Sequence, residues 1–223
     1  MYNDYYIKKY VFSGVIFIKK ILDVLGISDI AANFKNVRTI SLTAVLIALT
    51  IIGNGLMKIP LPMGLEIRFG FVFLSTIAFL FGPAVAFAAG FLTNMLAFLL
   101  FPTGAGFNPV FDLNIGLSGI LYAIFLYKRN AKSEYFIIWI VAAKASVNLI
   151  CHIIINTRLL MFFGYIPGSS AFIVTTARVF KNFMLMPVEI ILMFFIIKFV
   201  SVYANKYNFI KPYENKKVLN QKE

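Results

Sequence analysis

Six long apolar stretches run along this chain of 223 residues, and they constrain its fold more than any other feature. A helix needs about 20 consecutive apolar residues to cross a bilayer, where an unpaired backbone polar group is costly. Only 13% of the residues are charged, against roughly a quarter in a soluble domain. The pattern predicts an all-α, polytopic membrane protein, a bundle of six transmembrane helices at roughly 40–57, 69–82, 84–101, 113–127, 135–157 and 171–197. Two stretches, 69–82 and 113–127, are short for a perpendicular crossing and require tilt or local thinning of the bilayer.

Loop charges predict the orientation of these helices. With the N-terminus in the cytoplasm, 15 of the 21 Lys and Arg residues fall on the inner side, and only Lys58, Arg68 and Arg158 fall in outer loops. This is the positive-inside asymmetry, so both termini are expected to be cytoplasmic. A basic inner face on an anionic leaflet also explains the net charge of +12 without a nucleic-acid partner.

The chain divides into three predicted regions. Residues 1–38 form a cytoplasmic or interfacial segment, 39–200 form the six-helix membrane domain, and 201–223 form a polar cytoplasmic tail. Apolar residues recur at helical spacing in the first region, at Ile7, Val11, Val15, Ile18, Leu22 and Leu25. This spacing favours an amphipathic helix on the inner membrane surface, and a cleaved or disordered leader is the alternative.

The sequence lacks the residues that several classes of protein function require. No Gly-x-x-x-x-Gly-Lys-Ser/Thr loop is present to cradle nucleotide phosphates, and no Gly-x-Ser-x-Gly elbow is present. With one Cys (Cys151), one His (His152) and few carboxylates, neither an internal disulfide nor a metal site is expected. We therefore expect no enzyme and no cofactor, which leaves binding or transport.

Ionisable residues inside the apolar stretches are the best indication of function. Lys144, Arg178, Lys181 and Glu189 all lie within predicted helices. A charge deep in a membrane costs roughly 2.5–3.5 kcal/mol on insertion scales, so each needs a partner, a wet cavity or a ligand. Because three basic residues face one carboxylate, the surplus positive charge predicts an anionic ligand.

Depth along the helices predicts which of these groups meet. Lys144 lies about 13–15 Å from the inner end of its helix and Glu189 lies at a similar depth, so they are expected to form a structural ion pair. Arg178 and Lys181 fall nearer the outer surface, at the height of His152 and Asn156. Polar residues spaced four apart form a drifting stripe on the fifth helix, at Lys144, Asn148, His152 and Asn156.

Each candidate also has a purely structural interpretation. Arg178 and, less readily, the deeper Lys181 can snorkel to the outer headgroups. His152 can be a satisfied core histidine, and Asn148 and Asn156 can join helices by hydrogen bonds. Against these alternatives stand three elaborate outer loops, at 58–68, 101–112 and 158–170, while the inner connection Phe81–Ala84 is minimal. Such loops over a polar outer pocket favour a receptor loaded from outside.

Several separated motifs resemble the folate-specific S component of energy-coupling factor (ECF) vitamin transporters. They are Arg68-Phe69-Gly70-Phe71 through Leu80-Phe81-Gly82-Pro83, then Leu100-Phe101-Pro102-Thr103-Gly104, and Arg178-x-x-Lys181-Asn182 with Pro187-x-Glu189. The similarity covers about 38–200. It implies a six-helix subunit of the bacterial cell membrane that captures a vitamin at its outer face. The subunit then docks on a transmembrane scaffold subunit with two ATPases, and topples so that the site opens inward.

The resemblance also suggests roles for individual residues. Ala44-x-x-x-Ala48 is similar to the small-residue docking patch of such subunits, although the same spacing also serves internal packing. The glutamyl carboxylates of folate would meet Arg178, Lys181 and Arg68. Its pterin edge would be read by Asp112, Asn156 or Asn182 beside His152, and Phe107 or Phe111 would stack on the flat rings.

Two alternatives stay open. One is an S component for another vitamin, such as thiamine or a queuosine precursor, although the basic surplus would repel a cation such as thiamine. The other is a membrane scaffold protein whose buried charges only set helix register. Stabilisation by members of a vitamin panel separates these hypotheses, because a scaffold would respond to none.

Overall fold

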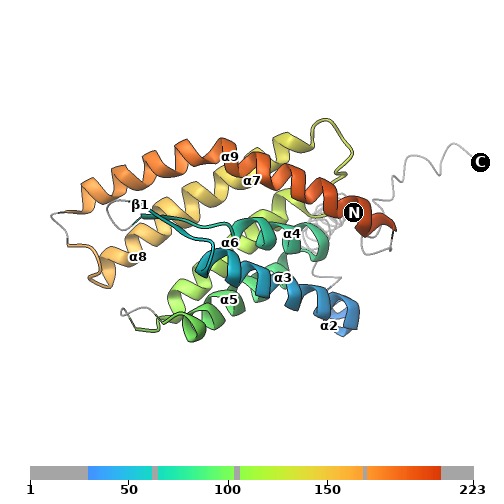
Figure 1. Ribbon diagram of the computed structural model, residues 1–223, viewed down its shortest axis with the longest axis horizontal. Helices are drawn as coiled ribbons and strands as arrows, with labels where there is room; N and C mark the ends of the chain where they lie inside the picture. The colour runs from blue at the N-terminus through green and yellow to red at the C-terminus, as the bar shows by residue number, and fades with distance from the viewer. Residues whose placement is uncertain (1–29, 62–64, 103–105, 168–169, 207–223) are drawn as a thin grey trace, which may run out of the picture.

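The computed structural model describes residues 30–61, 65–102, 106–167 and 170–206, and most of them are helical (Figure 1). A two-stranded antiparallel hairpin, β1 (Ile59–Leu61) and β2 (Leu65–Ile67), pairs Pro60 with Glu66. The helices are α2 (Ile30–Lys35), α3 (Val37–Gly55), α4 (Phe71–Phe81), α5 (Pro83–Leu100), α6 (Pro109–Leu126), α7 (Phe136–Val147), the π-helix η3 (Asn148–Ile155), α8 (Asn156–Phe162) and α9 (Ala171–Lys206).

Five helices in the described part of the chain are long and apolar enough to cross a membrane: Val37–Gly55, Pro83–Leu100, Pro109–Leu126, Phe136–Phe162 and Ala171–Ala204. The sixth predicted span is α4, an apolar helix of 11 residues, so only this one stays short. The stretch predicted at 113–127 gains a turn, because the Asn108 side chain caps α6 by accepting from the Val110 N–H and Pro109 suits the first helical position. The prediction of an all-α, polytopic membrane protein is confirmed.

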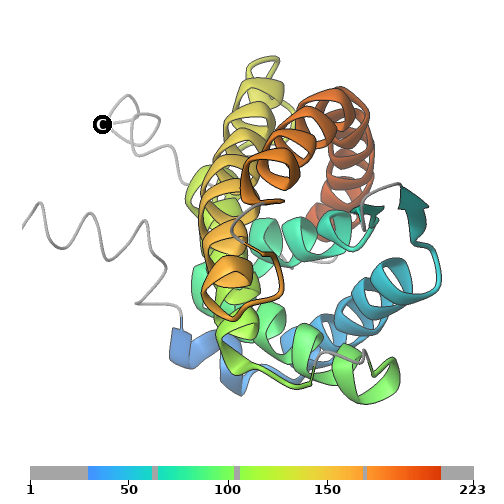
Figure 2. The ribbon, with the colours of Figure 1, turned by 90° about the vertical axis from the view of Figure 1, so that its left-hand side faces the viewer.

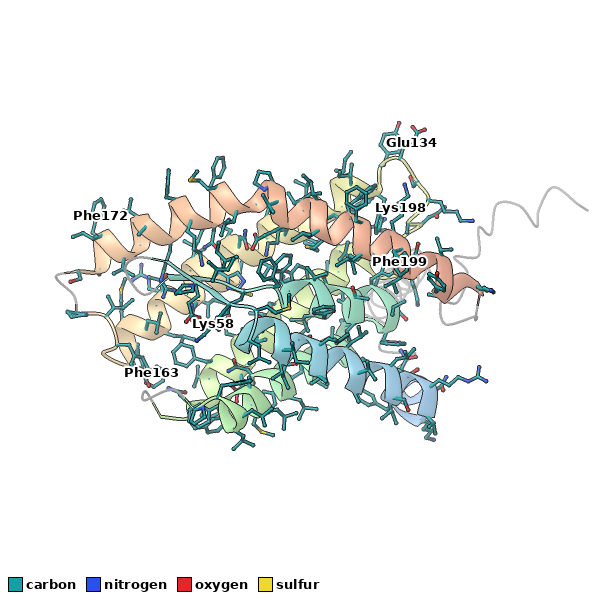
Figure 3. All side chains as sticks on the ribbon, in the orientation of Figure 1. Lys58, Glu134, Phe163, Phe172, Lys198 and Phe199 are labelled. Carbon is teal, nitrogen blue, oxygen red and sulfur yellow. The ribbon has the colours of Figure 1, made fainter. Side chains whose placement is uncertain are left out.

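The connections segregate to two ends of the bundle (Figures 1 and 2). The hairpin, the α5–α6 connection and the α8–α9 connection lie at one end, which we call the hairpin end. Helix α2, the α6–α7 connection and the end of α9 lie at the opposite end, which we call the basic end. Lys58 and Phe163 mark the hairpin end, and Glu134 and Lys198 mark the basic end (Figure 3).

The packed core occupies the half of the bundle toward the basic end. Its most buried side chains come from α4, α6, α7 and α9, at 0–1% exposure: Ile77, Leu126, Phe136, Ile140, Met193 and Ile197. The rings of Phe79 and Phe136 meet edge to face, with centroids 5.8 Å apart. Burial of this apolar surface and close contact hold the helices together at this end.

Helices α5 and α6 approach each other unusually closely. A Cβ atom on Gly119 would lie 2.4 Å from the carbonyl oxygen of Ala86, and one on Gly90 would lie 2.7 Å from that of Ile115. Glycine at these two positions lets the backbones touch, which is how helices gain packing contacts in lipid.

Helices extend across both ends of the predicted membrane domain, 39–200. Helix α3 begins at Val37, and α9 runs past residue 200 to Lys206 with Ser201 and Ala204 buried. At the start, the Asn33 side chain donates to the Phe81 carbonyl oxygen at 2.9 Å and ties α2 to the α4–α5 turn. The predicted amphipathic helix between Ile7 and Leu25 lies outside the described residues, as does the tail after 206.

Candidate functional site

A cavity of about 690 Å³ occupies the half of the bundle toward the hairpin end. Residues of the hairpin and of helices α3 to α9, η3 included, line it, and its size is typical of small-molecule sites. All nine residues that the sequence suggested for ligand binding line it: Arg68, Phe107, Phe111, Asp112, His152, Asn156, Arg178, Lys181 and Asn182. Lys144 and Glu189 also reach its wall. The structure thus brings these residues together, whatever the role of each.

Two cations of α9 face the cavity one turn apart. The Lys181 ammonium donates to the backbone carbonyl oxygen of Glu66 at 3.0 Å, which links α9 to the hairpin. The Nε of Arg178 is buried, and the described residues offer it no hydrogen-bond partner. A charged donor in this situation needs an acceptor, because an unpaired buried charge is costly.

The hairpin contributes a carboxylate held between two further cations. The Glu66 carboxylate lies 2.7 Å from Nη2 of Arg68 and 3.3 Å from Nζ of Lys58. Partial burial raises the pKa of Glu66, but hydrogen bonds and attraction from Arg68 and Lys58 outweigh it and hold that pKa below its usual value. Glu66 therefore stays ionised at neutral pH, and Arg68 is already partly neutralised.

The wall made by α5 and α6 is polar and deeply buried. Asp112 is 1% exposed, and one of its oxygens accepts a hydrogen bond from the Asn94 side chain. Its other oxygen has no partner among the described residues, and the same holds for buried oxygens of Thr93, Asn114 and Tyr122. Such groups are normally paired in proteins, so this wall is suited to a ligand that brings several polar atoms.

The helix packed against α6, formed by α7, η3 and α8, carries a π-helical segment. Residues Asn148–Ile155 follow i→i+5 hydrogen bonding, and the Asn114 side chain on α6 donates to the Cys151 carbonyl oxygen at 3.2 Å. His152 and Asn156 line the cavity from this segment and from the start of α8. Asn148, a member of the predicted polar stripe, is buried and is not part of the cavity lining.

Aromatic rings gather where the cavity meets the hairpin end. Phe107 packs on Phe98 with ring centroids 5.4 Å apart, and Phe111 lies 6.1 Å from the Tyr165 ring and 6.0 Å from the Phe163 ring. Phe107 is 49% exposed. These flat side chains are suited to contact with a planar ring system.

The Lys144 and Glu189 side chains meet at the end of the cavity that is nearest the packed core. Their nitrogen and oxygen atoms are 3.1 Å apart, and the Lys144 ammonium lies 3.9 Å from the centre of the Phe71 ring. The remaining suggested residues, Ala44 and Ala48, are exposed on α3 and do not line the cavity. No cluster of His, Cys, Asp and Glu that could hold a metal ion is found among the described residues.

Sequence reasoning found Asn156 and Asn182 but missed several other uncharged polar residues of the site. Asn54 accepts a hydrogen bond from the Gly70 N–H at 3.0 Å and so fixes the junction of the hairpin with α4. Asn94, Asn114 and Tyr122 complete the α5–α6 wall. The only available signal was a polar residue in an apolar stretch, which helix–helix hydrogen bonds explain equally well.

The charges around the cavity do not balance. Among the described residues, five cationic side chains line it, Lys58, Arg68, Lys144, Arg178 and Lys181, against three carboxylates, Glu66, Asp112 and Glu189. Glu189 lies beside Lys144, and Glu66 is shared between Lys58 and Arg68, so Arg178 and Lys181 are the two lining cations that no carboxylate of the described residues pairs with. The arrangement can bind and orient an anionic molecule with a polar, planar part.

In the described part of the chain, five helices long and apolar enough to cross a membrane surround a polar cavity at one end, and this arrangement defines a membrane-embedded binding protein for a small molecule. A family model described as the ECF-type riboflavin transporter, S component, matches residues 34–203. The chain belongs to this family, and it is therefore a substrate-binding subunit of a transporter. The ECF S component predicted from the sequence is confirmed.

Two individual proteins are also similar. A folate transporter, FolT, of Clostridium novyi (strain NT) is 24% identical over 160 residues, which cover 72% of this chain and 88% of the relative. A crystal structure of FolT bound with folic acid superposes with a TM-score of 0.59 and 28% identity, and the match covers 72% of this chain and 91% of that one.

Proposed function

We propose that this S component captures folate at its outer face and delivers it to a separate transmembrane and ATPase module. The observation that carries this proposal is the position of Arg178 and Lys181 in the cavity wall, where no carboxylate of the described residues pairs with either cation. The similarity to FolT proteins, one of them bound with folic acid, supports the same ligand.

The ligand's two chemical parts fit two parts of the cavity. The glutamyl carboxylates bind Arg178 and Lys181, whose charge-assisted hydrogen bonds are stronger than neutral ones. The pterin presents donors and acceptors to Asp112, Asn156 and Asn182, beside His152. Phe107 and Phe111 contact the flat rings near the hairpin end.

Riboflavin is the second candidate, because the matching family model is described as a riboflavin transporter component. Riboflavin offers the site a planar ring but no carboxylate. It would therefore leave the partly buried charge of Arg178 without an anionic partner. The charge of the cavity favours folate.

The transport module and membrane orientation belong to the same proposal. Ala44 and Ala48 are exposed on α3, and small residues four apart allow a helix of the ECF scaffold subunit to approach closely. Two ATPase subunits supply the energy, since this chain lacks a phosphate-binding loop. The basic end faces the bacterial cytoplasm together with both termini, and the hairpin end faces outside.

Binding measurements on the purified protein in detergent test the ligand. We expect Arg178→Ala and Lys181→Ala each to weaken folate binding by about 2–5 kcal/mol, the usual cost of truncating one partner of a desolvated charge pair. Arg158→Ala is the matched control, because Arg158 is exposed on α8 and does not line the cavity. Unchanged folate affinity in both variants, or tighter binding of riboflavin than of folate by the wild type, would contradict the proposal.

A further inference from the structure

Four cations line the cavity near the hairpin, and we call them the cationic mouth: Lys58, Arg68, Arg178 and Lys181. Glu66 contacts three of them. Its Oε2 accepts from Nε and Nη2 of Arg68 at 2.8 and 2.7 Å, and its Oε1 lies 3.3 Å from Lys58. Its backbone carbonyl oxygen accepts from Lys181 of α9 at 3.0 Å. One carboxylate of the protein thus already occupies the place where positive charge gathers for an anionic ligand.

Glu66 neutralises only part of this charge. Within the described residues its carboxylate is paired with Lys58 and Arg68, while Arg178 stays outside the pair. Both contacts from Arg68 go to a single oxygen, and the Arg68 side chain is 56% exposed, so its other N–H groups remain accessible. One anionic group of a ligand can therefore bind Arg178 and Lys181 without competing with a carboxylate of the protein. Any further anionic group has to compete with Glu66 for Arg68 and Lys58.

We propose that Glu66 is a specificity-determining residue that limits how many carboxylates the ligand's tail brings into the mouth. This inference rests on the proposed function. The first ligand carboxylate binds Arg178 and Lys181 while Glu66 keeps its own partners. Each further carboxylate has to share Arg68 and Lys58 with Glu66, and it meets the repulsion of a like charge. The site thereby selects a short, singly glutamylated tail over a long polyanionic one.

Affinities for three probes that differ in tail charge test this inference. The probes are pteroic acid, which lacks glutamate, folic acid with one glutamate, and pteroyl-triglutamate, measured by calorimetry in detergent. We expect Glu66→Gln to improve the affinity for the triglutamate relative to pteroic acid by about fivefold, the size of effect of a partly exposed charge pair. Folic acid should show a smaller gain, and raised salt should shrink both gains.

Three comparisons make the result decisive. Lys58→Gln should change the same ratio in the opposite direction, because it removes a cation that the extra carboxylates would share with Glu66. Glu134→Gln makes the same change of charge at the basic end and should leave every ratio unaltered (Figure 3). Glu66→Asp, which keeps the negative charge, should restore the order of affinities of the wild type.

Two outcomes overturn the inference and separate it from the proposed function. If Glu66→Gln weakens all three probes equally, or leaves their ratios unchanged while the wild type binds folic acid, Glu66 only holds the hairpin. If the wild type binds none of the probes, the proposed function fails and this inference fails with it.

Discussion

At the scale of single residues, Lys144 is one of the most deeply buried charges of the described bundle, so its desolvation is costly. It is 1% exposed, and its ammonium lies 3.1 Å from the Glu189 carboxylate and 3.9 Å from the centre of the Phe71 ring. Removing two ions from water is expensive, and their mutual attraction offsets the cost only when the geometry is good. Lys144 is therefore tolerated because Glu189 lies at the same depth on a neighbouring helix.

Removing the charge of only one member of this pair should destabilise the protein far more than removing both charges. Lys144→Met or Glu189→Gln alone is expected to lower the free energy of unfolding by about 3–5 kcal/mol, because one buried charge is left uncompensated. The double variant Lys144→Met/Glu189→Leu should lose much less than the sum of the two losses. Denaturant unfolding in detergent provides the measurement, and additive losses would show that the two residues act independently.

Asp112 permits a prediction about the other part of the ligand. One of its oxygens is held by Asn94 and the other is buried with no partner among the described residues, so it is positioned to accept from a ring N–H. Asp112→Asn replaces an acceptor by an amide of the same shape and should weaken pteroic acid and folic acid alike, by about 1–3 kcal/mol. Arg178→Ala should instead weaken folic acid much more than pteroic acid. Equal effects of the two substitutions on both probes would contradict the proposed orientation of the ligand.

The sequence identified four charged residues of the cavity because the bilayer penalises charge so strongly that each one must be explained. Arg178, Lys181, Lys144 and Glu189 all stood out on this ground. Amide side chains carry no such penalty. Asn94 and Asn114 pair with groups 18 and 37 residues away, and only the packed helices bring these partners together.

At the scale of elements, the π-helix was the least predictable feature. The sequence predicted one continuous helix over 135–157, and the structure continues it to Phe162 with η3 in the middle. Residues four apart advance by about 40° around an α-helix, so the stripe from Lys144 to Asn156 would drift away from one face. A π-helical turn holds more residues and reverses this drift, which brings Lys144, His152 and Asn156 to the same cavity. No local residue preference in the sequence predicts such a π-helical segment.

Restoring α-helical register in this element should abolish binding without unfolding the helix. Deleting Leu149, which is 55% exposed, removes one residue from the widened segment and rotates Lys144 away from His152. Asn114→Leu is a milder variant, because it leaves the Cys151 carbonyl oxygen without its side-chain donor and should cost about 1–3 kcal/mol of stability. We expect both variants to retain their helical circular dichroism and to lose folate affinity. Retained affinity in the deletion variant would show that the π-helix does not position the site.

The hairpin was predicted only as an outer loop at 58–68. Each of its strands has three residues, and Pro60 lies in β1, where a proline usually argues against a strand. The pairing of Pro60 with Glu66 is held together by tertiary contacts, since Lys181 of α9 and Asn54 of α3 bind the hairpin and its junction with α4. Short strands of this kind follow from their surroundings rather than from their sequence.

At the scale of the whole molecule, the bundle is divided between a solid half and a hollow half. The core of α4, α6, α7 and α9 fills the half near the basic end, and the cavity with its polar wall fills the half near the hairpin end. The connections between helices follow the same division. The short Phe81–Pro83 turn lies at the packed end, whereas the hairpin and two longer connections surround the cavity (Figures 1 and 2). Capture from outside requires the hollow half to face the external medium.

Cysteine labelling in intact cells tests that orientation directly. The chain has a single cysteine, Cys151, which is buried, and Cys151→Ala provides a background without thiols. In this background Phe163→Cys places an exposed thiol at the hairpin end and Glu134→Cys places one at the basic end (Figure 3). A membrane-impermeant maleimide should label Phe163→Cys in intact cells, and should label Glu134→Cys only after the membrane is opened. The reverse pattern would turn the cavity toward the cytoplasm, and uptake from outside would then need a different entry route.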